Sequence, residues 1–155
     1  MKTAFVTGGS RGIGSAIALA LGNNFHVVVG FANSEDKAND VVKEIVAAGG
    51  SASTVQIDIS DAESVDNAFT TIEKEYNSVD VLINNAGVTK DNILPRMKED
   101  EWLEVIQTNL TGSFYTSQRA IKLMMKNGTR IYCISLLVRT EFEVCGAITS
   151  VLLFF

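Results

Sequence analysis

The sequence predicts an α/β protein with a three-layer, doubly wound parallel β-sheet. Three observations predict this fold: strand-like and helix-like segments alternate, the strand-like segments are short and nearly continuously apolar, and helices of about 10–15 residues separate them. Strands that are covered by helices on both faces carry such apolar runs. A helix between consecutive strands returns the chain for parallel pairing with a right-handed crossover, so the pattern is typical of repeated βαβ units.

Five strands are expected. The first ends at a glycine cluster, the second is β-branched and follows Asn23-Asn24, and the later three carry short runs of valine or isoleucine. They cover residues 4–6, 26–29, 54–57, 79–83 and 130–134.

Four helices are expected between these strands. The second has the clearest limits, because Ser34 can cap it, its apolar residues recur at helical spacing, and Gly49-Gly50 end it. The fourth has the longest helical pattern, but Gly112 interrupts it. The helices cover residues 13–21, 34–48, 61–76 and 98–126.

Composition limits the classes of function. The chain has 155 residues, enough for one domain, and 46% of them are hydrophobic and 20% charged. A net charge of −5 without a basic patch argues against nucleic acid as a partner. Cys133 and Cys145 match no metal-ligand spacing, so no metal site is expected. No signal peptide is recognisable, and the longest uncharged stretch has twelve residues, fewer than the ~20 of a membrane span. We therefore expect a soluble, cytoplasmic protein with no membrane partner.

The turn TGGSRGIG, residues 7–14, lies between the first strand and the first helix. Gly8 lets the chain turn sharply, Gly12 lets a pyrophosphate approach the backbone, and Gly14 lets the helix pack close to the sheet. The helix N-terminus then offers free N–H groups and a positive dipole end to the phosphates. A glycine-rich turn without a ligand is the alternative, but the position of this turn favours a Rossmann-type dinucleotide site.

The end of the second strand indicates which dinucleotide is bound. NAD-binding units usually carry an acidic residue about 20 residues beyond the glycines, which binds the ribose 2′-hydroxyl. Here the strand leads into GFANS, residues 30–34, and the first carboxylate is Glu35 in the next helix. The absent acid and the nearby Arg11 favour NADP(H), although Arg11 can also be a solvated loop arginine.

Three motifs resemble the short-chain dehydrogenase/reductase family. They are the Gly-x-x-x-Gly-x-Gly spacing of the turn, the NNAG at residues 84–87, and Asn109 within QTNLTG. With DIS at residues 58–60 and MKEDEW at residues 97–102, they stand in family order and are most similar to the bacterial 3-oxoacyl-[acyl-carrier-protein] reductases. The resemblance implies a homotetrameric enzyme of fatty acid biosynthesis that uses NADPH to reduce a 3-oxoacyl thioester of acyl carrier protein or CoA. Close relatives reduce acetoacetyl-CoA in polyester synthesis.

The resemblance also implies roles for single residues. It makes Asn109 the residue that supports the proton relay of the family. Three positions keep a plainer alternative: Asp58 can cap a helix before Ser60, Asn84-Asn85 can form a simple turn, and Asn109 can be an ordinary polar residue. The implied cofactor contacts are Gly8 in the turn, Ser10, Arg11, Gly12, Ile13 and Gly14 at the phosphates, Asn33 and Ser34 near the 2′-phosphate, Asp58 and Ile59 at the adenine, and Asn85, Ala86 and Gly87 along the nicotinamide ribose.

The catalytic pattern of the family stops at the fifth strand. The family uses a serine after this strand, and a tyrosine followed four residues later by a lysine, to stabilise charge that develops on oxygen. Leu136 stands at the serine position, no tyrosine follows Tyr132, and no lysine follows Lys126. We therefore expect residues 1–135 to form an NADP-binding domain whose sheet is incomplete at its C-terminal end, and residues 136–155 to be an aberrant apolar tail.

A shifted reading frame near Thr129 would explain this abrupt change, and a natural short form with a sixth strand at residues 151–155 is the alternative. In either case apolar helix faces such as Ile121 and Met124 lose their cover, so we expect poor solubility and no native tetramer. The second class of function is therefore a binding module that holds NADP(H) and catalyses nothing.

Overall fold

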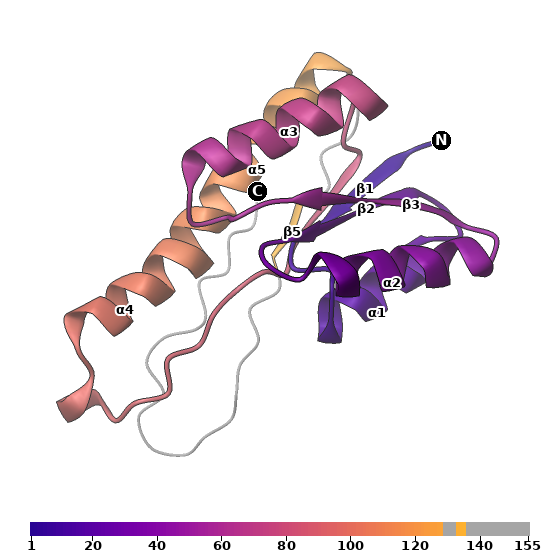
Figure 1. The fold of residues 1–155 in the computed structure, drawn as a ribbon. Coiled ribbons are helices and arrows are strands. Elements are labelled where there is room, and N and C mark those ends of the chain that lie inside the picture. The colour runs from indigo at the N-terminus through magenta and orange to yellow at the C-terminus, as the bar shows by residue number, and fades with distance from the viewer. Residues whose placement is uncertain (129–132, 136–155) are drawn as a thin grey trace.

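The fold is an open α/β sheet. The structure, a computed structural model, describes residues 1–128 and 133–135. Five parallel strands lie in the order β3-β2-β1-β4-β5 (Figure 1), which confirms the predicted fold class. The strands are β1 (Thr3–Val6), β2 (His26–Phe31), β3 (Ser51–Gln56), β4 (Val81–Asn84) and β5 (Cys133–Ser135). The helices are α1 (Gly12–Leu21), α2 (Glu35–Ala47), α3 (Ala62–Tyr76), α4 (Glu99–Val105) and α5 (Ser113–Lys126), with a 3₁₀ turn η1 (Leu94–Arg96) and a π-helical segment η2 (Ile106–Gly112).

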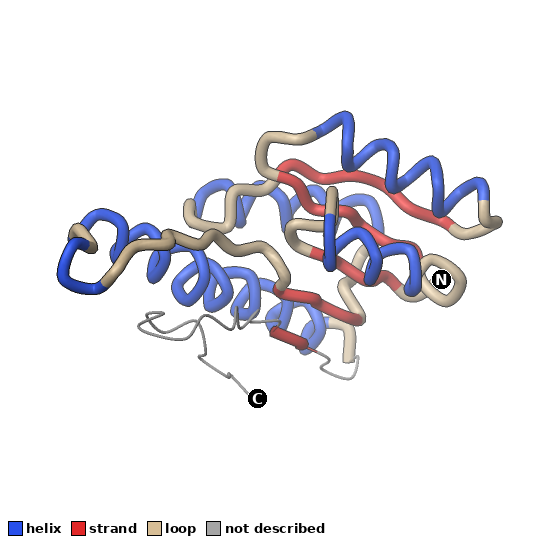
Figure 2. Tube along the Cα trace, turned by 90° about the horizontal axis from the view of Figure 1, so that it is seen from below, coloured by secondary structure: helices blue, strands red, loops and turns tan. Residues whose placement is uncertain are grey.

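Helices cover both faces of the sheet and give the predicted three layers. Helices α1 and α2 lie on one side, and α3 and α5 lie on the other (Figures 1 and 2). Successive strand residues point to opposite faces. Phe5 and Val28 therefore pack in the core that α3 and α5 complete, whereas Val6 and Val27 pack with α1 and α2.

The order of the strands reverses at β1. From β1 the chain adds β2 and β3 on one side, and it then crosses to β4 and β5 on the other. Phe5 of β1 lies opposite both Val28 and Leu82. In open α/β sheets the ligand crevice lies outside the carboxyl ends of the strands at this switch point. The fold thus places the glycine turn, which follows β1, at the centre of that edge.

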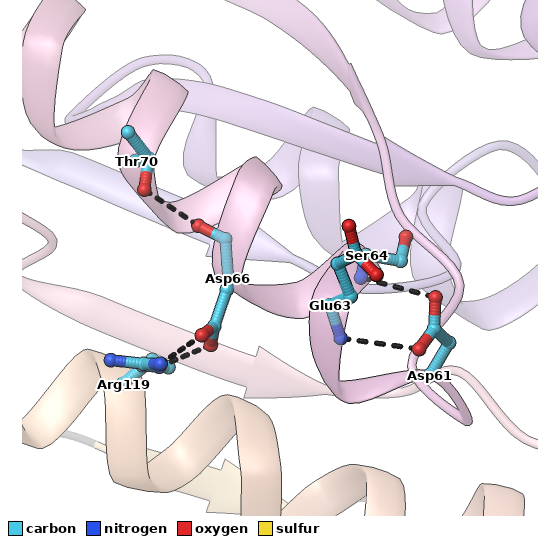
Figure 3. Close-up of polar contacts among 6 residues, drawn as sticks. All are labelled: Asp61, Glu63, Ser64, Asp66, Thr70 and Arg119. Atoms are coloured by element: carbon cyan, nitrogen blue, oxygen red, sulfur yellow. Dashed lines mark hydrogen bonds and ion pairs between the residues drawn. The ribbon is translucent and has the colours of Figure 1, made fainter.

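Helix α3 is capped at its start and fastened to α5. The Asp61 carboxylate accepts hydrogen bonds from the N–H groups of Glu63 (3.1 Å) and Ser64 (3.2 Å). Farther along, both carboxylate oxygens of Asp66 accept bonds from the Arg119 guanidinium of α5 (Figure 3). The contact between Asp66 and Arg119 joins α3 to α5, the two helices that cover one face of the sheet.

The predicted long helix consists of three segments. Helix α4 begins at Glu99, η2 spans Ile106–Gly112, and α5 follows. The interruption that was predicted at Gly112 is therefore real, but it already begins at Ile106. Wide π-helical turns of this kind are rare and are frequently found at functional sites.

Strand β3 starts earlier than its apolar residues predict. It begins at Ser51 rather than at residue 54, and its first four residues are only partly buried. It pairs with β2 alone, at the edge of the sheet. An edge strand can carry polar residues, so the apolar run marked only its end.

Two predicted details are wrong. Ser34 holds the N-cap position of α2, but its side chain makes no capping hydrogen bond. Met124 is completely buried in the core, because its side of α5 packs toward α3 and the sheet, and the neighbouring Met125 is 70% exposed instead. Residues 130–132 of the predicted fifth strand, Leu136 and the whole predicted tail lie outside the described residues, so the division at residue 135, the frame change and the sixth strand stay predictions.

Candidate functional site

A cleft of about 740 Å³ opens at the carboxyl ends of the strands. Every predicted cofactor-contact residue except Gly14 lines it. The lining residues that sequence reasoning missed are Phe31, Ala32, Ile57, Ser60, Val88, Glu104 and Thr108. The first five of these lie within two residues of predicted ones, whereas Glu104 belongs to α4 and Thr108 to η2, and both reach the cleft by tertiary packing.

Residues of the glycine turn line the cleft. Gly8 and Gly12 have φ angles of 62° and 59°, a left-handed conformation that other residues rarely adopt. A Cβ on Gly8 would lie 2.9 Å from the Cα of Ala86, so the turn touches the loop after β4. A Cβ on Gly12 would meet nothing within 4 Å. The backbone at Gly12 is therefore accessible to a ligand.

Gly14 lies behind the cleft rather than in its lining. A Cβ there would lie 2.3 Å from the Gly8 carbonyl oxygen and 2.4 Å from Nδ2 of Asn85. This close approach agrees with the packing role that the sequence predicts for Gly14. Its direct contact with a phosphate stays a prediction.

The first turn of α1 faces the cleft with a positive end. The helix begins at Gly12 after Arg11, no side chain caps it, and its first turn contains no acidic residue. Arg11 and Ile13 both line the cleft and are exposed. Free N–H groups, the helix dipole and a guanidinium together form a site suited to a phosphate.

The end of β2 carries no carboxylate. Phe31, Ala32, Asn33 and Ser34 line the cleft there, as far as the start of α2. The Gln56 side chain of β3 donates a hydrogen bond to the Ala32 carbonyl (3.2 Å) and supports this part of the wall. The lining is therefore uncharged at the position where an NAD-binding unit presents an acid.

The two carboxylates in the lining are already engaged. Asp58 accepts hydrogen bonds from the N–H (2.9 Å) and the hydroxyl (2.7 Å) of Ser60, whereas the cap of α3 is Asp61, so the capping alternative for Asp58 is wrong. Glu104 pairs with Lys90 at 2.9 Å, and this hydrogen bond raises the pKa of Lys90. Glu104 thus has a cationic partner, whereas the Asp58 carboxylate accepts hydrogen bonds from Ser60 alone among the described residues.

The loop after β4 is tied to the glycine turn through Thr7 and Asn85. The buried Thr7 hydroxyl accepts hydrogen bonds from the N–H groups of Asn85 and Ala86, both at 3.1 Å. The Asn85 side chain donates to the carbonyls of Thr7 (3.1 Å) and Gly8 (3.0 Å). Asn84 is buried and bonds to Thr116 (2.7 Å) in α5. The asparagine pair is thus more than a simple turn, because it joins β1, β4 and α5.

Asn109 of η2 makes two hydrogen bonds to the same loop. Its Oδ1 accepts the N–H of Val88 (2.8 Å), and its Nδ2 donates to the Val88 carbonyl (2.9 Å). A Cβ on Gly87 would lie 3.0 Å from Oδ1 of Asn109, so the glycine permits this approach. Asn109 is therefore not an ordinary exposed polar residue, and its part in a proton relay stays a prediction.

Other kinds of site find no support within the part of the chain that the structure describes. No group of three or more histidine, cysteine, aspartate or glutamate side chains there could hold a metal ion. Nor does that part contain a helix long and apolar enough to cross a membrane.

Comparison with protein families identifies relatives. A model of the short chain dehydrogenase family matches residues 2–141. The 3-oxoacyl-[acyl-carrier-protein] reductase FabG of Staphylococcus aureus is 46% identical over 126 residues, which cover 81% of this chain and 51% of that protein. The 3-oxoacyl-[acyl-carrier-protein] reductase of Synechocystis is 47% identical over 126 residues, again with 81% and 51% covered. The chain spans about half the length of these relatives.

Two solved structures share the fold. A metagenomic short-chain oxidoreductase in complex with NADP superposes with a TM-score of 0.81 at 34% identity, over 86% of this chain and 61% of that one. A double mutant of a Serratia marcescens short-chain dehydrogenase/reductase gives a TM-score of 0.74 at 33% identity, over 78% and 50% of the two chains.

Proposed function

The chain belongs to the short-chain dehydrogenase/reductase family, and from that premise we propose that its cleft binds NADP(H). The observation that carries the proposal is the cleft itself, which joins Gly12, the free first turn of α1 and Arg11 to a β2 end without a carboxylate. The NADP complex of the metagenomic relative supports it.

The residues of the cleft fit the parts of this cofactor. Gly12 and the first turn of α1 would hold the pyrophosphate, and Arg11, with Asn33 and Ser34, would hold the 2′-phosphate. Asp58 and Ile59 would contact the adenine. Residues 85–87 would line the nicotinamide ribose. When bound, NADPH would supply a hydride to a carbonyl substrate.

For the complete protein we propose reduction of a 3-oxoacyl thioester to its 3-hydroxyacyl form. The names of the Staphylococcus and Synechocystis relatives support this reaction and acyl carrier protein as the carrier. A CoA thioester such as acetoacetyl-CoA is the alternative substrate. This reaction belongs to cytoplasmic fatty acid biosynthesis.

For these 155 residues alone we propose cofactor binding without turnover. One observation favours this second candidate: the sequence has Leu136 at the family serine position, no tyrosine after Tyr132 and no lysine after Lys126. The groups that would bind the carbonyl oxygen and donate a proton to it are therefore missing. Residues 1–135 would act as the binding domain, in which Asn109 orders the loop after β4.

Cofactor titration tests the binding proposal. The quenching of Trp102 fluorescence, or the enhancement of NADPH fluorescence, gives Kd values for NADPH and NADH. We expect tighter binding of NADPH, and Arg11→Ala should remove about tenfold of that preference, because it removes a charge-assisted bond to the 2′-phosphate. Arg96→Ala is the matched control, since Arg96 is exposed in η1 and outside the cleft. Equal affinity of the unaltered chain for both cofactors would contradict the proposal.

An activity assay tests the second candidate. NADPH oxidation is followed at 340 nm with acetoacetyl-CoA as substrate, first for the 155-residue chain and then for the Staphylococcus relative as a positive control. We expect no turnover above background from the chain. Turnover comparable with that of the control would overturn the proposed inactivity and leave the binding proposal intact.

A further inference from the structure

The π-helical segment η2 contacts the loop that follows β3 at two places. The Gln107 side-chain amide donates a hydrogen bond to the Ser60 carbonyl at 2.8 Å, across 47 residues of sequence. Farther along, Gly112 lies against Ile59 so closely that a Cβ on the glycine would lie 2.7 Å from the Ile59 carbonyl oxygen. Residues 57–60 form one wall of the cleft, hereafter the β3 wall.

The same segment serves the opposite wall of the cleft. Gln107 bonds to the β3 wall, Thr108 lines the cleft, and Asn109 grips Val88 in the loop after β4. Three successive residues thus contact one wall, the cleft and the other wall. A π-helix has more residues per turn than an α-helix, which changes the directions of successive side chains. The irregular turn therefore directs Gln107 and Asn109 to the two walls and Thr108 to the cleft between them.

The β3 wall is also held by the burial of Ile57 and Ile59 in the core and by hydrogen bonds at short range. The Asp58 carboxylate bonds to Ser60 within the wall, the Asp58 carbonyl accepts the N–H of Asp61 at 3.2 Å, and the Asp58 N–H donates to the Ser64 hydroxyl of α3 at 2.9 Å. Ile57 continues the pairing with β2, because its N–H donates to the Phe31 carbonyl at 2.8 Å. To these anchors Gln107 and Gly112 add the contacts of the wall with η2.

We infer that η2 positions the β3 wall for the adenosine half of the cofactor, with Gln107 and Gly112 as positioning residues. The inference rests on the proposed binding of NADP(H). Neither residue lines the cleft, so each acts through the wall. Gln107 supplies a hydrogen bond to the wall, and Gly112, which has no side chain, lets Ile59 of the wall approach η2 closely.

Two half-ligands separate this role from a general loss of stability. Adenosine 2′,5′-bisphosphate carries the adenosine half of NADP, and reduced nicotinamide mononucleotide carries the other half. Gln107→Leu should weaken binding of the bisphosphate about three- to tenfold, the effect of one lost hydrogen bond. It should leave affinity for the mononucleotide unchanged, whereas a globally destabilised chain would lose both.

Two further variants sharpen the test. Gly112→Ala should weaken binding of the bisphosphate more than Gln107→Leu, because its methyl group would displace the backbone of Ile59. Gln118→Leu is the matched control: it removes an exposed glutamine from α5, which follows η2 but lies outside the cleft, and should change neither affinity.

A measurement without ligand keeps the inference testable by itself. Backbone ¹⁵N order parameters of residues 58–60 should fall in Gln107→Leu and stay unchanged in Gln118→Leu. If the unaltered chain binds neither half-ligand, the proposed function fails, while the order parameters still decide whether Gln107 holds the wall. Unchanged order parameters, or bisphosphate affinity equal to that of the unaltered chain in both Gln107→Leu and Gly112→Ala, would overturn the inference.

Discussion

At the amino ends of the strands polar side chains bond to one another, whereas at the carboxyl ends they line a cleft. His26 of β2 stacks on Tyr76 with ring centroids 4.3 Å apart, and its ring nitrogens lie 2.7 and 3.1 Å from the hydroxyls of Ser51 and Ser53. The Tyr76 hydroxyl completes the network with a bond to Ser53 at 2.9 Å. No comparable closed set of side chains covers Gly12 or Arg11 among the described residues.

The two ends of the strands therefore have different roles: the amino ends stabilise the fold, and the carboxyl ends form the cleft. The amino ends join β2, β3 and α3 with groups that satisfy one another. The carboxyl ends have two layers: Gly12 and Arg11 face the cleft, and Thr7 and Gly14 support them from behind, while Asn85 lines the cleft and bonds back to Thr7. Substitutions should therefore have different effects in each layer, and four predictions test this division.

Gly14→Ala should have the largest effect. The added methyl group would lie 2.3 Å from the Gly8 carbonyl oxygen, so backbone must move. Such overpacking costs about 3 kcal/mol of the free energy of unfolding, even though alanine favours a helix. Urea denaturation measures the cost. An unchanged midpoint would show that the supporting layer is less tightly packed than the geometry indicates.

Thr7→Val should have the next largest effect. The substitution keeps the shape of the side chain but removes the hydroxyl that accepts the N–H groups of Asn85 and Ala86. Unsatisfied buried donors cost about 2 kcal/mol, measured by the same denaturation. Thr7→Ser retains the hydroxyl and is the matched control. Equal losses for both variants would assign the effect to packing rather than to these hydrogen bonds.

Gly12→Ala should show the opposite balance. The methyl group would meet no protein atom within 4 Å, and only the left-handed φ of 59° is strained, at about 1 kcal/mol. The same methyl group would project toward the cleft, so we expect NADPH affinity to fall about tenfold or more. A variant that loses stability like Gly14→Ala but binds normally would break the division between the layers.

The effect of pH at His26 should be the smallest. Burial lowers the pKa of His26 below 6.5, opposed by the nearby Glu75. A folded-state pKa below the unfolded value means that the neutral form is favoured on folding, so this contribution is present above about pH 6.5 and is lost as pH falls through the folded pKa. The free energy of unfolding between pH 7.5 and 5.5 should fall more steeply for the unaltered chain than for His26→Gln. Identical slopes would exclude His26 as the cause.

The sequence predicted the local parts of the site well. The glycine turn, Asn33, Ser34, Asp58 and residues 85–87 all follow directly after strands, and the carboxyl ends of parallel strands meet at one edge. Turn chemistry and strand order were therefore sufficient to bring them together.

Parts that depend on tertiary packing could not be predicted in this way. Glu104 and Thr108 reach the cleft only because α4 and η2 pack beside it, and neither has a local motif. The start of β3 at Ser51 was not predicted, because its first residues are polar or small and the strand was inferred from apolar residues. Met124 was assigned to an exposed face because the sequence does not reveal which side of α5 packs against α3 and the sheet.

The irregular turn η2 also separates the rotational settings of the helices on either side of it. In a regular α-helix each residue advances the chain by about 100° around the axis, so the buried face of α5 would dictate where the side chains of α4 point. The π-helical turn breaks this dependence. If the seven residues of η2 formed a regular α-helix instead, α4 would be rotated about the helix axis relative to α5, and Glu104 would turn away from Lys90 while Met124 stayed in the core. The segment η2 thus lets α5 keep Met124 in the core while α4 presents Glu104 to the cleft.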